Sequence, residues 1–459
     1  MGTSAPAIGF QGSVGHGFRF VNGAQALDGG REVLIKLVAM LDPRLFLENL
    51  FRRAVAAADP DRSVRANLPE RPAGRTVVVG AGKGAAQLAQ AFERAWDGPL
   101  TGTVVTRRGF AVPCERIRVI EASHPVPDAA GLEGSAALFD AVKGLGPDDL
   151  VVSLVCGGGS ALLPFPGGDL TLEEEIGLNQ ALLASGAPIA AMNTIRKHVS
   201  GIKGGRLAAA AWPARVESLV VSDIPGDDPA QVASGPTAPD NSTRADALAL
   251  VERYRLALSP AVMAHLASPA ADAPRPDDPR FARNRVRLIA SAGVSLEAAA
   301  ALAREEGVEA AILSDAIEGE AREVGKVHAA LAREVALRDR PFAKPVVILS
   351  GGETTVTVRA KGKGGRNTEF LLSLALGIEG VDGLHALAAD TDGIDGSEDN
   401  AGAFADGTSA ARLRGMGLDP HAFLAGNDCW SAFHRLGDLF VPGPTGTNVN
   451  DFRAILALA

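Results

Sequence analysis

Short runs of apolar residues alternate with longer Ala-rich segments along most of the chain. In the first half, runs rich in Val, Ile and Leu predict strands at 76–79, 102–106, 116–121, 150–155 and 216–222, and Ala-rich segments predict helices near 43–58, 85–96, 129–142 and 172–185. Runs that are apolar throughout are typical of strands buried on both faces of a parallel sheet. The pattern therefore predicts a doubly wound α/β domain whose ligand loops follow the carboxyl ends of the strands.

The pattern changes after residue 244, where a helical segment is followed by a stretch rich in Pro and Asp. We interpret 246–283 as a crossing helix and linker. A second α/β pattern follows, with strands predicted at 287–291, 309–314, 345–350, 354–359 and 385–389, helices at 296–306, 321–335 and 369–376, and further helices after 406 that close the chain. The predicted fold is therefore α/β in two domains, a Rossmann-like N-terminal domain over 31–245 and a smaller C-terminal domain over 284–459.

Composition narrows the class of protein. Hydrophobic residues make up 46% and charged residues 22% of the chain, as in soluble globular proteins, and no apolar run approaches the roughly 20 residues that span a bilayer. The net charge of -9 disfavours generic attraction to nucleic acid. The three cysteines are widely spaced, and the first 20 residues look like a loose extension without a secretory signal. A reducing cytoplasm is expected.

Two glycine-rich turns follow predicted strands of the first domain. Gly80-Ala-Gly82-Lys83 lacks the Walker A pattern and matches the dinucleotide-binding pattern GxGxxG/A only loosely, but its amides and Lys83 are suited to an anion. Tight packing of strand against helix is the structural alternative. In Gly157-Gly158-Gly159-Ser160, three residues without Cβ let a ligand approach the backbone, and Ser160 adds a hydroxyl. We favour ligand binding there over a purely structural turn.

A basic segment, residues 192–206, contains Asn193, Arg196, Lys197 and Lys203. If the segment is helical, Arg196 and Lys203 share a face. A solvated basic helix is the common alternative for such a charge run. Only nine of the 45 basic residues are Lys, however, and five of those nine lie in or beside glycine-rich segments. This bias favours anion binding.

Acidic residues follow predicted strands in both domains. Asp223 lies at the end of the strand at 216–222, and Asp390 and Asp392 follow the strand at 385–389, with Asp395 close behind. Carboxylates grouped in this way can bind Mg²⁺ directly or through water, although Asp is also common in turns. The EF-hand pattern is not matched. Lone histidines such as His124 are more often structural, so we leave them out of the catalytic set.

The loop Gly365-Arg366-Asn367 opens a predicted helix, and Glu353 follows a Gly-Gly pair at the end of the strand at 345–350. Backbone amides and a guanidinium are the groups that stabilise a transferring phosphoryl group. Together with the carboxylates after 389, these loops predict phosphoryl-transfer chemistry.

In order along the chain, several motifs resemble the glycerate 2-kinase family, whose C-terminal domain is of the MOFRL type. They are Gly80–Lys83, Ser123–Asp128, Gly157–Ser160, Arg196–Arg206, Ser222–Asp228, Gly364–Asn367, Asp390–Gly396 and Gly443–Asp451. The resemblance runs from about Leu41 to the C-terminus.

The resemblance implies ATP- and Mg²⁺-dependent phosphorylation of D-glycerate at its 2-hydroxyl, in a cleft between two domains. The sequence leaves the assembly open, with a homodimer as one option. By position in the motifs, Lys83 and Arg366 would surround the transferring phosphoryl group. Asp390 and Asp392 would bind metal or orient the hydroxyl. We assign Asp390 to catalysis with Lys83 and Arg366, and Asp223 and Asp392 to Mg²⁺. The residues expected to bind substrate or nucleotide are Gly82, Gly157, Gly158, Gly159, Ser160, Asn193, Arg196, Lys197, Lys203, Glu353, Gly365 and Asn367.

Two other functions fit part of the sequence. An NAD(P)H-dependent hydroxypyruvate reductase fits the glycine pattern at Gly80 and the pair Arg107-Arg108 after the next strand, where an Arg accepts the 2'-phosphate of NADP. The acidic C-terminal loops have no purpose in hydride transfer. A non-catalytic protein that binds a sugar acid or phosphate needs the phosphate loops but not the Asp cluster. We therefore favour the kinase.

Overall fold

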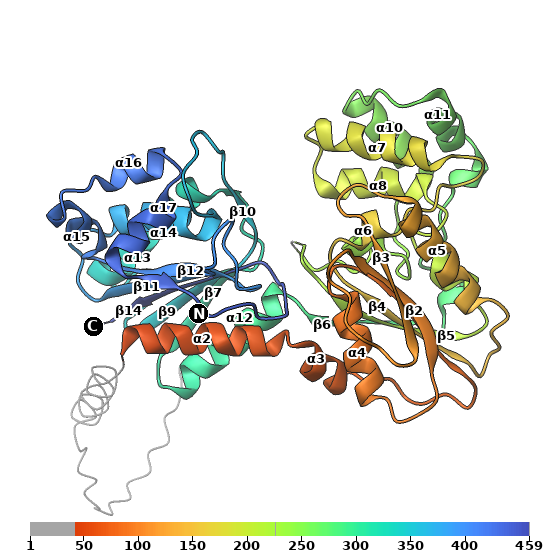
Figure 1. Ribbon diagram of the computed structural model, residues 1–459, viewed down its shortest axis with the longest axis horizontal. Helices are drawn as coiled ribbons and strands as arrows, with labels where there is room; N and C mark the ends of the chain where they lie inside the picture. Colours follow the sequence, from red (N-terminus) through yellow and green to blue (C-terminus); the bar gives the residue numbers. More distant parts are fainter. Residues whose placement is uncertain (1–41, 225, 459) are drawn as a thin grey trace, which may run out of the picture. The chain divides into compact units, whose positions relative to one another are not determined.

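The computed structural model describes residues 42–224 and 226–458, so the predicted N-terminal extension lies outside the described residues. Its first sheet has six strands in the order β3-β2-β1-β4-β5-β6, and every neighbouring pair is parallel (Figure 1). The strands are β1 (Thr76–Ala81), β2 (Thr101–Arg107), β3 (Ile117–Ala122), β4 (Leu150–Val155), β5 (Arg215–Val221) and β6 (Arg285–Ala290). This order, with its reversal between β1 and β4, is that of the Rossmann fold and confirms the predicted doubly wound architecture.

Helices cover both faces of this sheet because neighbouring residues of each strand point to opposite sides. Val78 of β1 packs in one core with Leu88 and Phe92 of α4 (Ala85–Ala95). Its neighbours Val77 and Val79 belong to a second core, which also contains side chains of α5 (Ala129–Val142). The short helices α3 (Pro60–Ala66), α6 (Gly159–Leu162) and α9 (Arg206–Ala210) complete the connections. The central strands β1 and β4 are thus buried on both sides, as their apolar sequences predict, whereas the edge strands β3 and β6 are partly exposed.

Four helices form a separate cluster with its own apolar core: α7 (Leu172–Ala184), α8 (Ile189–Val199), α10 (Arg244–Arg253) and α11 (Pro260–Ala267). The segment interpreted as a crossing helix and linker therefore contains two of these packed helices. The basic segment also differs from expectation, because α8 ends at Val199 and Gly205 adopts φ +81° before α9. Arg196 and Lys203 accordingly do not share one helix face.

The second sheet is mixed, with the strand order β13-β12-β11-β14-β9-β7. Its strands are β7 (Glu309–Ser314), β9 (Val346–Ser350), β11 (Leu384–Asp390), β12 (Gly402–Asp406), β13 (Leu439–Phe440) and β14 (Asp451–Ala457). Only the β7–β9 pair is parallel. The chain was expected to close with helices. It ends instead with β14, which lies between β9 and β11, and the register of this pairing sets Asp451 opposite Asp390.

Helices α13 (Ala321–Arg338) and α14 (Arg366–Gly377) cover one face of the second sheet, and α2 (Pro43–Ala57) and α12 (Ala292–Glu305) cover the other (Figure 1). The short helices α15 (Ser409–Gly415), α16 (Pro420–Ala425) and α17 (Cys429–Leu436) pack around α14, and a two-stranded ribbon pairs β8 (Gly319–Glu320) with β10 (Thr354–Thr355). The predicted strand at 354–359 is thus much shorter than expected.

Two elements pack with a sheet other than the one that the predicted domain boundaries assign to them. Strand β6 falls after the predicted start of the second domain, but it pairs with β5 and extends the first sheet. Helix α2 falls within the predicted first domain, but its Phe51 packs edge-on against Phe440 and Phe452 of the second sheet. Within the described residues, no helix combines the length and apolarity needed to cross a membrane.

Candidate active site

The turn after β1 places Lys83 beside the loop after β4. The amide of Lys83 donates to the carbonyl of Gly157 over 2.8 Å, and the amide of Gly84 donates to Sγ of Cys156 over 3.2 Å. At Gly82, where φ is +143°, a Cβ would lie 2.2 Å from that sulfur, so only glycine fits. Because the strand order reverses between β1 and β4, Lys83 stands at the position where doubly wound folds bind ligands.

The glycine loop after β4 makes room for protein side chains. A Cβ on Gly157 would lie 1.7 Å from Oδ2 of Asp223, and one on Gly158 would lie 3.0 Å from Cγ of Lys83 and 3.2 Å from Nε2 of His124. The loop thus gathers Lys83, Asp223 and His124. Burial raises the pKa of Asp223, with Lys83 opposing the rise and Glu353 adding to it. Burial lowers the pKa of His124, and Lys83 and Arg107 lower it further.

Ser160, Asn193 and Arg196 belong to one chain of hydrogen bonds. Oγ of Ser160 lies 2.9 Å from Oγ of Ser234, which donates to Oδ1 of Asn193 over 3.2 Å. Arg196 donates from Nη1 to the same Oδ1 and from Nε to Oδ1 of Asn179. Burial lowers the pKa of Arg196. These three predicted binding residues are therefore brought together, but none of them lines the two cavities described below.

Lys197 and Lys203 are buried in ion pairs. Nζ of Lys197 binds the carboxylate of Asp240, and Nζ of Lys203 donates to Oε1 of Glu175 over 3.0 Å and to the carbonyl of Leu163 over 2.8 Å. Both side chains are almost fully inaccessible to solvent. Their charges thus already have partners inside the protein. Ligand binding by these two lysines stays a prediction.

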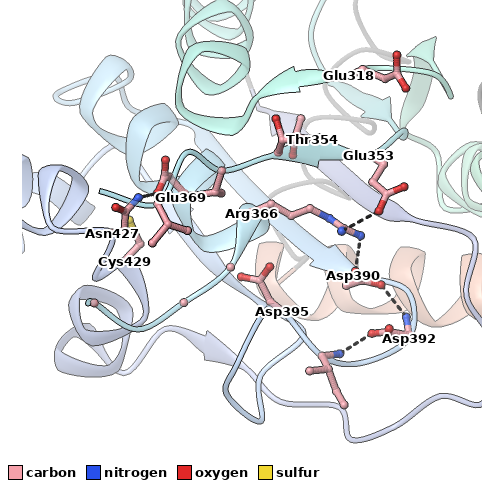
Figure 2. A pocket seen from close by; sticks show the side chains of 18 residues that line it. Glu318, Glu353, Thr354, Arg366, Glu369, Asp390, Asp392, Asp395, Asn427 and Cys429 are labelled. Atoms are coloured by element: carbon pink, nitrogen blue, oxygen red, sulfur yellow. Dashed lines mark hydrogen bonds and ion pairs between the residues drawn. The ribbon is translucent and has the colours of Figure 1, made fainter. Parts of the chain in front are cut away.

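Arg366, in the first turn of α14, donates to three carboxylates. Nε donates to Oδ1 of Asp451 over 2.6 Å, Nη2 to Oδ2 of Asp390 over 2.6 Å, and Nη1 to Oε1 of Glu353 over 3.1 Å. Figure 2 shows the guanidinium between Glu353 and Asp390, with Asp392 next to Asp390. Its orientation is thus fixed from three sides.

Burial and the shared charges shift the pKa values of this cluster. Burial by itself would lower the pKa of the Arg366 guanidinium. The negative charges of Asp451, Asp390 and Glu353 have a larger effect, so the pKa is raised. Burial also raises the pKa of Asp390 well above its ordinary value. Arg366 opposes this rise, and Asp392 and Asp451 add to it because three carboxylates lie close together. Asp390 is thus a carboxyl group with a raised proton affinity.

Asp451 is the residue of this cluster that the predicted site lacks. Its carboxylate also accepts from Nδ2 of Asn367 over 2.9 Å, from the amide of Thr354 over 3.2 Å, and from Arg453. The residue is only 2% exposed. The sequence does contain a signal, because Asp451 begins an apolar run just as Asp390 ends one. The pairing of those two strands, which sets the carboxylates side by side, is not visible in the sequence.

The N-terminal amides of α14 bind a carboxylate of the protein. The backbone amides of Asn367 and Thr368 each donate to Asp395 over 2.9 Å. A Cβ on Gly365 would lie 2.3 Å from Oδ1 of Asp395, which explains why glycine precedes the helix. An anion at a helix N-terminus is favourable, and here the side chain of Asp395 supplies it. The amide of Asn367, which we expected to help hold a transferring phosphoryl group, thus already has a partner in Asp395.

Several of the predicted site residues line one or both of two cavities. A cavity of about 790 Å³ is lined by Arg366, Asp390, Glu353 and Gly365 among others (Figure 2). A second cavity of about 380 Å³ is lined by Lys83, Gly157 and Asp223 among others. Asp392 and Ile394 line both. Asp392 therefore lies between the residues around Lys83 and the residues around Arg366.

Within residues 42–224 and 226–458, no group of three His, Cys, Asp or Glu side chains is arranged to enclose a metal ion. Mg²⁺ at phosphoryl-transfer sites usually takes one or two carboxylates, with water and phosphate oxygens as the other ligands. Asp223 and Asp392 line the same cavity, and among the described residues neither carboxylate forms an ion pair with a Lys, Arg or His nitrogen. This pair of oxygen donors fits an ion of that kind.

Comparisons with known proteins agree with the two-part organisation. Residues 46–267 match the model of a domain of unknown function, DUF4147, and residues 346–451 match the MOFRL family. The chain is 53% identical over 416 residues to a protein of Agrobacterium vitis named as a hydroxypyruvate reductase, an alignment that covers 90% of this chain and 94% of that protein.

The chain is also 39% identical over 419 residues to a D-glycerate 2-kinase of Thermotoga maritima, covering 90% of this chain and 98% of the relative. The crystal structure of a glycerate kinase from the same organism superimposes with a TM-score of 0.83 at 38% identity, covering 93% of this chain and 100% of that one.

Proposed function

Because this chain belongs to the glycerate 2-kinase family with a MOFRL C-terminal region, we propose that it transfers the γ-phosphoryl group of ATP to the 2-hydroxyl of D-glycerate, giving 2-phosphoglycerate and ADP. The observation that carries the proposal is the 39% identity to a D-glycerate 2-kinase over 90% of the chain. The arrangement of charged groups around Lys83 and Arg366 supports it.

Two cations would stabilise the transferring group. Lys83 stands on the glycine turn after β1, and Arg366 is held by three carboxylates at the start of α14. Charge accumulates on the phosphoryl oxygens during transfer, and fixed cations stabilise it without reorganising. Because Arg366 is already held by its carboxylates, it would lose little side-chain freedom when substrate binds.

Asp390 would accept the proton of the 2-hydroxyl. Its raised pKa gives it a higher proton affinity than an ordinary Asp, while Arg366 holds its carboxylate in place. As the proton moves to Asp390, the hydroxyl oxygen forms a bond to the γ-phosphorus. The bond from that phosphorus to the bridging oxygen breaks, and its electron pair leaves with ADP. Asp392 lies two residues further on, at the junction of the cavities.

Asp223 and Asp392 would hold Mg²⁺, and the glycine turns and the hydrogen-bonded chain near Lys83 would contact substrate or nucleotide. Bound there, the ion would neutralise charge on the phosphate oxygens. The turns around Lys83 contain Gly82, Gly157 and Gly158. Ser160, Asn193 and Arg196 form the adjoining hydrogen-bonded chain.

The reductase is the second candidate because a relative at 53% identity carries that name and the first sheet has the Rossmann order. The structure offers little for a 2'-phosphate, since Arg108 donates to Asp128 over 2.6 Å and the guanidinium of Arg107 lies over the ring of Phe110. The carboxylates around Arg366 also have no evident use in hydride transfer. The kinase therefore accounts for more of the site.

One pair of assays separates the two functions. ADP is quantified by chromatography after incubation with ATP, Mg²⁺ and D-glycerate, and NAD(P)H oxidation is followed with hydroxypyruvate. Enolase in the first assay converts only 2-phosphoglycerate to phosphoenolpyruvate, so it identifies the hydroxyl that is phosphorylated. We expect ADP and phosphoenolpyruvate. Oxidation of NAD(P)H without ADP release would replace the kinase by the reductase.

A matched pair of lysine variants ties the activity to the site. Lys83→Met removes the cation at the turn after β1, whereas Lys143→Met removes an exposed cation beyond α5. We expect ADP release to collapse only in Lys83→Met. An equal effect of both substitutions would show that Lys83 has no special place in catalysis.

We also propose that the protein works in a reducing cytoplasm as a homodimer. Its three cysteines are all free thiols, in keeping with such a compartment. Light scattering of the purified protein would test the assembly, and a monomeric mass would contradict the dimer.

A further inference from the structure

The cavity beside Lys83 has an apolar side that the proposed chemistry does not use. Leu88 of α4 and Val221 of β5 line it, together with Phe110 and Ile394. Phe110 is 40% exposed and Ile394 45% exposed, and both line this cavity. Exposed apolar groups that face one cavity are typical of a binding site for a flat apolar ring.

The same cavity holds two cations beside two carboxylates, Asp223 and Asp392, whereas its neighbour is mostly acidic. Lys83 and Arg107 both line the smaller cavity, and among the described residues neither has a carboxylate within 4 Å. In the larger cavity a single guanidinium, Arg366, faces six carboxylates: Glu318, Glu353, Glu369, Asp390, Asp392 and Asp395. Of the two cavities, the smaller one therefore repels a polyphosphate chain less. This cavity thus combines an apolar slot with cations.

Gln87 supplies a polar group in the slot. Its Nε2 donates to the carbonyl of Phe110 over 3.1 Å, while its Oε1 is shielded from solvent and has no donor among the described residues. Gln90, one turn further along α4, differs in this respect. Its Nε2 donates to the carbonyl of Pro113 over 2.7 Å, and its Oε1 accepts from Arg94. Of these two similar glutamines, only Gln87 lines the cavity and has an acceptor left over.

We propose that this cavity binds the purine ring of the nucleotide, and that the side chain of Gln87 turns so that its unpartnered Oε1 accepts a hydrogen bond from the 6-amino group of adenine. The inference rests on the proposed kinase function and adds the position of the base to it. The ring lies beside Phe110 and Ile394, and the phosphates run toward Lys83. Guanine carries a 6-oxo group in place of the amine, so two acceptors would face each other. Gln87 thereby selects ATP over GTP.

The test compares Gln87→Leu with Gln90→Leu. Both substitutions remove an amide from α4, and both leave the proposed catalytic residues in place. We expect Gln87→Leu to lower the ratio of kcat/KM for ATP to that for GTP by about tenfold, roughly what one hydrogen bond is worth, mainly by raising KM for ATP. Gln90→Leu should keep the wild-type ratio. An unchanged ratio in an active Gln87→Leu enzyme would overturn the inference and leave the kinase intact.

Calorimetric titration with ADP and GDP provides a readout that does not depend on turnover. We expect wild type to bind ADP more tightly than GDP, Gln87→Leu to lose this preference, and Phe110→Ala to bind both more weakly because stacking is lost. Phe110→Ala also tests the site if Gln87→Leu does not fold. Unchanged binding of both nucleotides by folded Phe110→Ala would overturn the inference. Tight, Gln87-dependent ADP binding without phosphorylation of D-glycerate would instead refute the proposed function and keep the nucleotide site.

Discussion

Replacing Asp451 by Asn tests whether the three-carboxylate arrangement orients Arg366. Every group that contacts the carboxylate of Asp451 is a donor: Arg366 and Asn367 at Oδ1, and Thr354 and Arg453 at Oδ2. An Asn side chain presents one oxygen and one NH₂ group. Whichever way it turns, the NH₂ group meets donors on one side, and the negative charge between two arginines is gone.

The expected magnitude follows from burial. The side chain of Asp451 is fully inaccessible, and breaking a buried charge pair by removing one partner costs about 3 to 5 kcal/mol. Glu353→Gln is the matched control, because Glu353 binds the same guanidinium but its side chain is 51% exposed. An exposed pair contributes only about 0.2 to 1 kcal/mol. The structure therefore predicts a difference of roughly 3 kcal/mol between two substitutions around a single arginine.

Native-state hydrogen exchange measures this locally, as the free energy of opening of the amides in β11 and β14. We expect a fall of about 3 kcal/mol in Asp451→Asn and under about 1 kcal/mol in Glu353→Gln. We also expect kcat to fall by about 10²-fold in Asp451→Asn, because a misplaced Arg366 no longer fits the transition state. Equal effects of the two substitutions on exchange, or normal kcat in Asp451→Asn, would refute the orienting role.

Lys83→Ala should cost about 2 kcal/mol or more of transition-state stabilisation, read from kcat/KM; a folded variant with wild-type kcat/KM would exclude the role. Because the pKa of Asp390 is raised, activity should fall on acidification at a higher pH than protonation of an ordinary Asp would cause. Asp390→Asn should lose most of the activity, and the activity that remains should not show this fall at acidic pH. If the fall at acidic pH is unchanged in this variant, another group causes it. Burial lowers the pKa of His328 from 6.5 to about 4, so between these values the unfolded chain binds a proton that the folded protein excludes. Stability against urea should therefore drop by up to about 3 kcal/mol as pH falls through this window, and His328→Gln should flatten the dependence.

The first sheet could be predicted closely from the sequence. Its five expected strands and the helices between them agree with the structure within a few residues, because the central strands β1 and β4 are apolar throughout and glycine-rich turns follow them. The positions of Lys83 and Arg366 at element ends were also visible, since glycine turns mark the ends of strands and the starts of helices.

The second sheet was harder to predict because its neighbours are not successive in the chain. The last strand, β14, lies between β9 and β11, and α2 from the start of the described chain packs on this sheet. Local periodicity carries no information on which strand pairs with which. The prediction that the chain closes with helices therefore missed β14, and with it the place of Asp451.

The sequence by itself determined which residue types are available at element ends, because backbone conformation and burial act on local pattern. Only the tertiary structure decided which charges meet. The partners of Arg366 lie from 13 to 85 residues away in the chain, and Lys197 and Lys203 find their carboxylates 43 and 28 residues away. Coulomb interactions depend on distance in the folded protein and on local burial. The same basic side chains could thus be read as binding groups from the sequence, whereas in the fold some face a cavity and others are neutralised inside the protein.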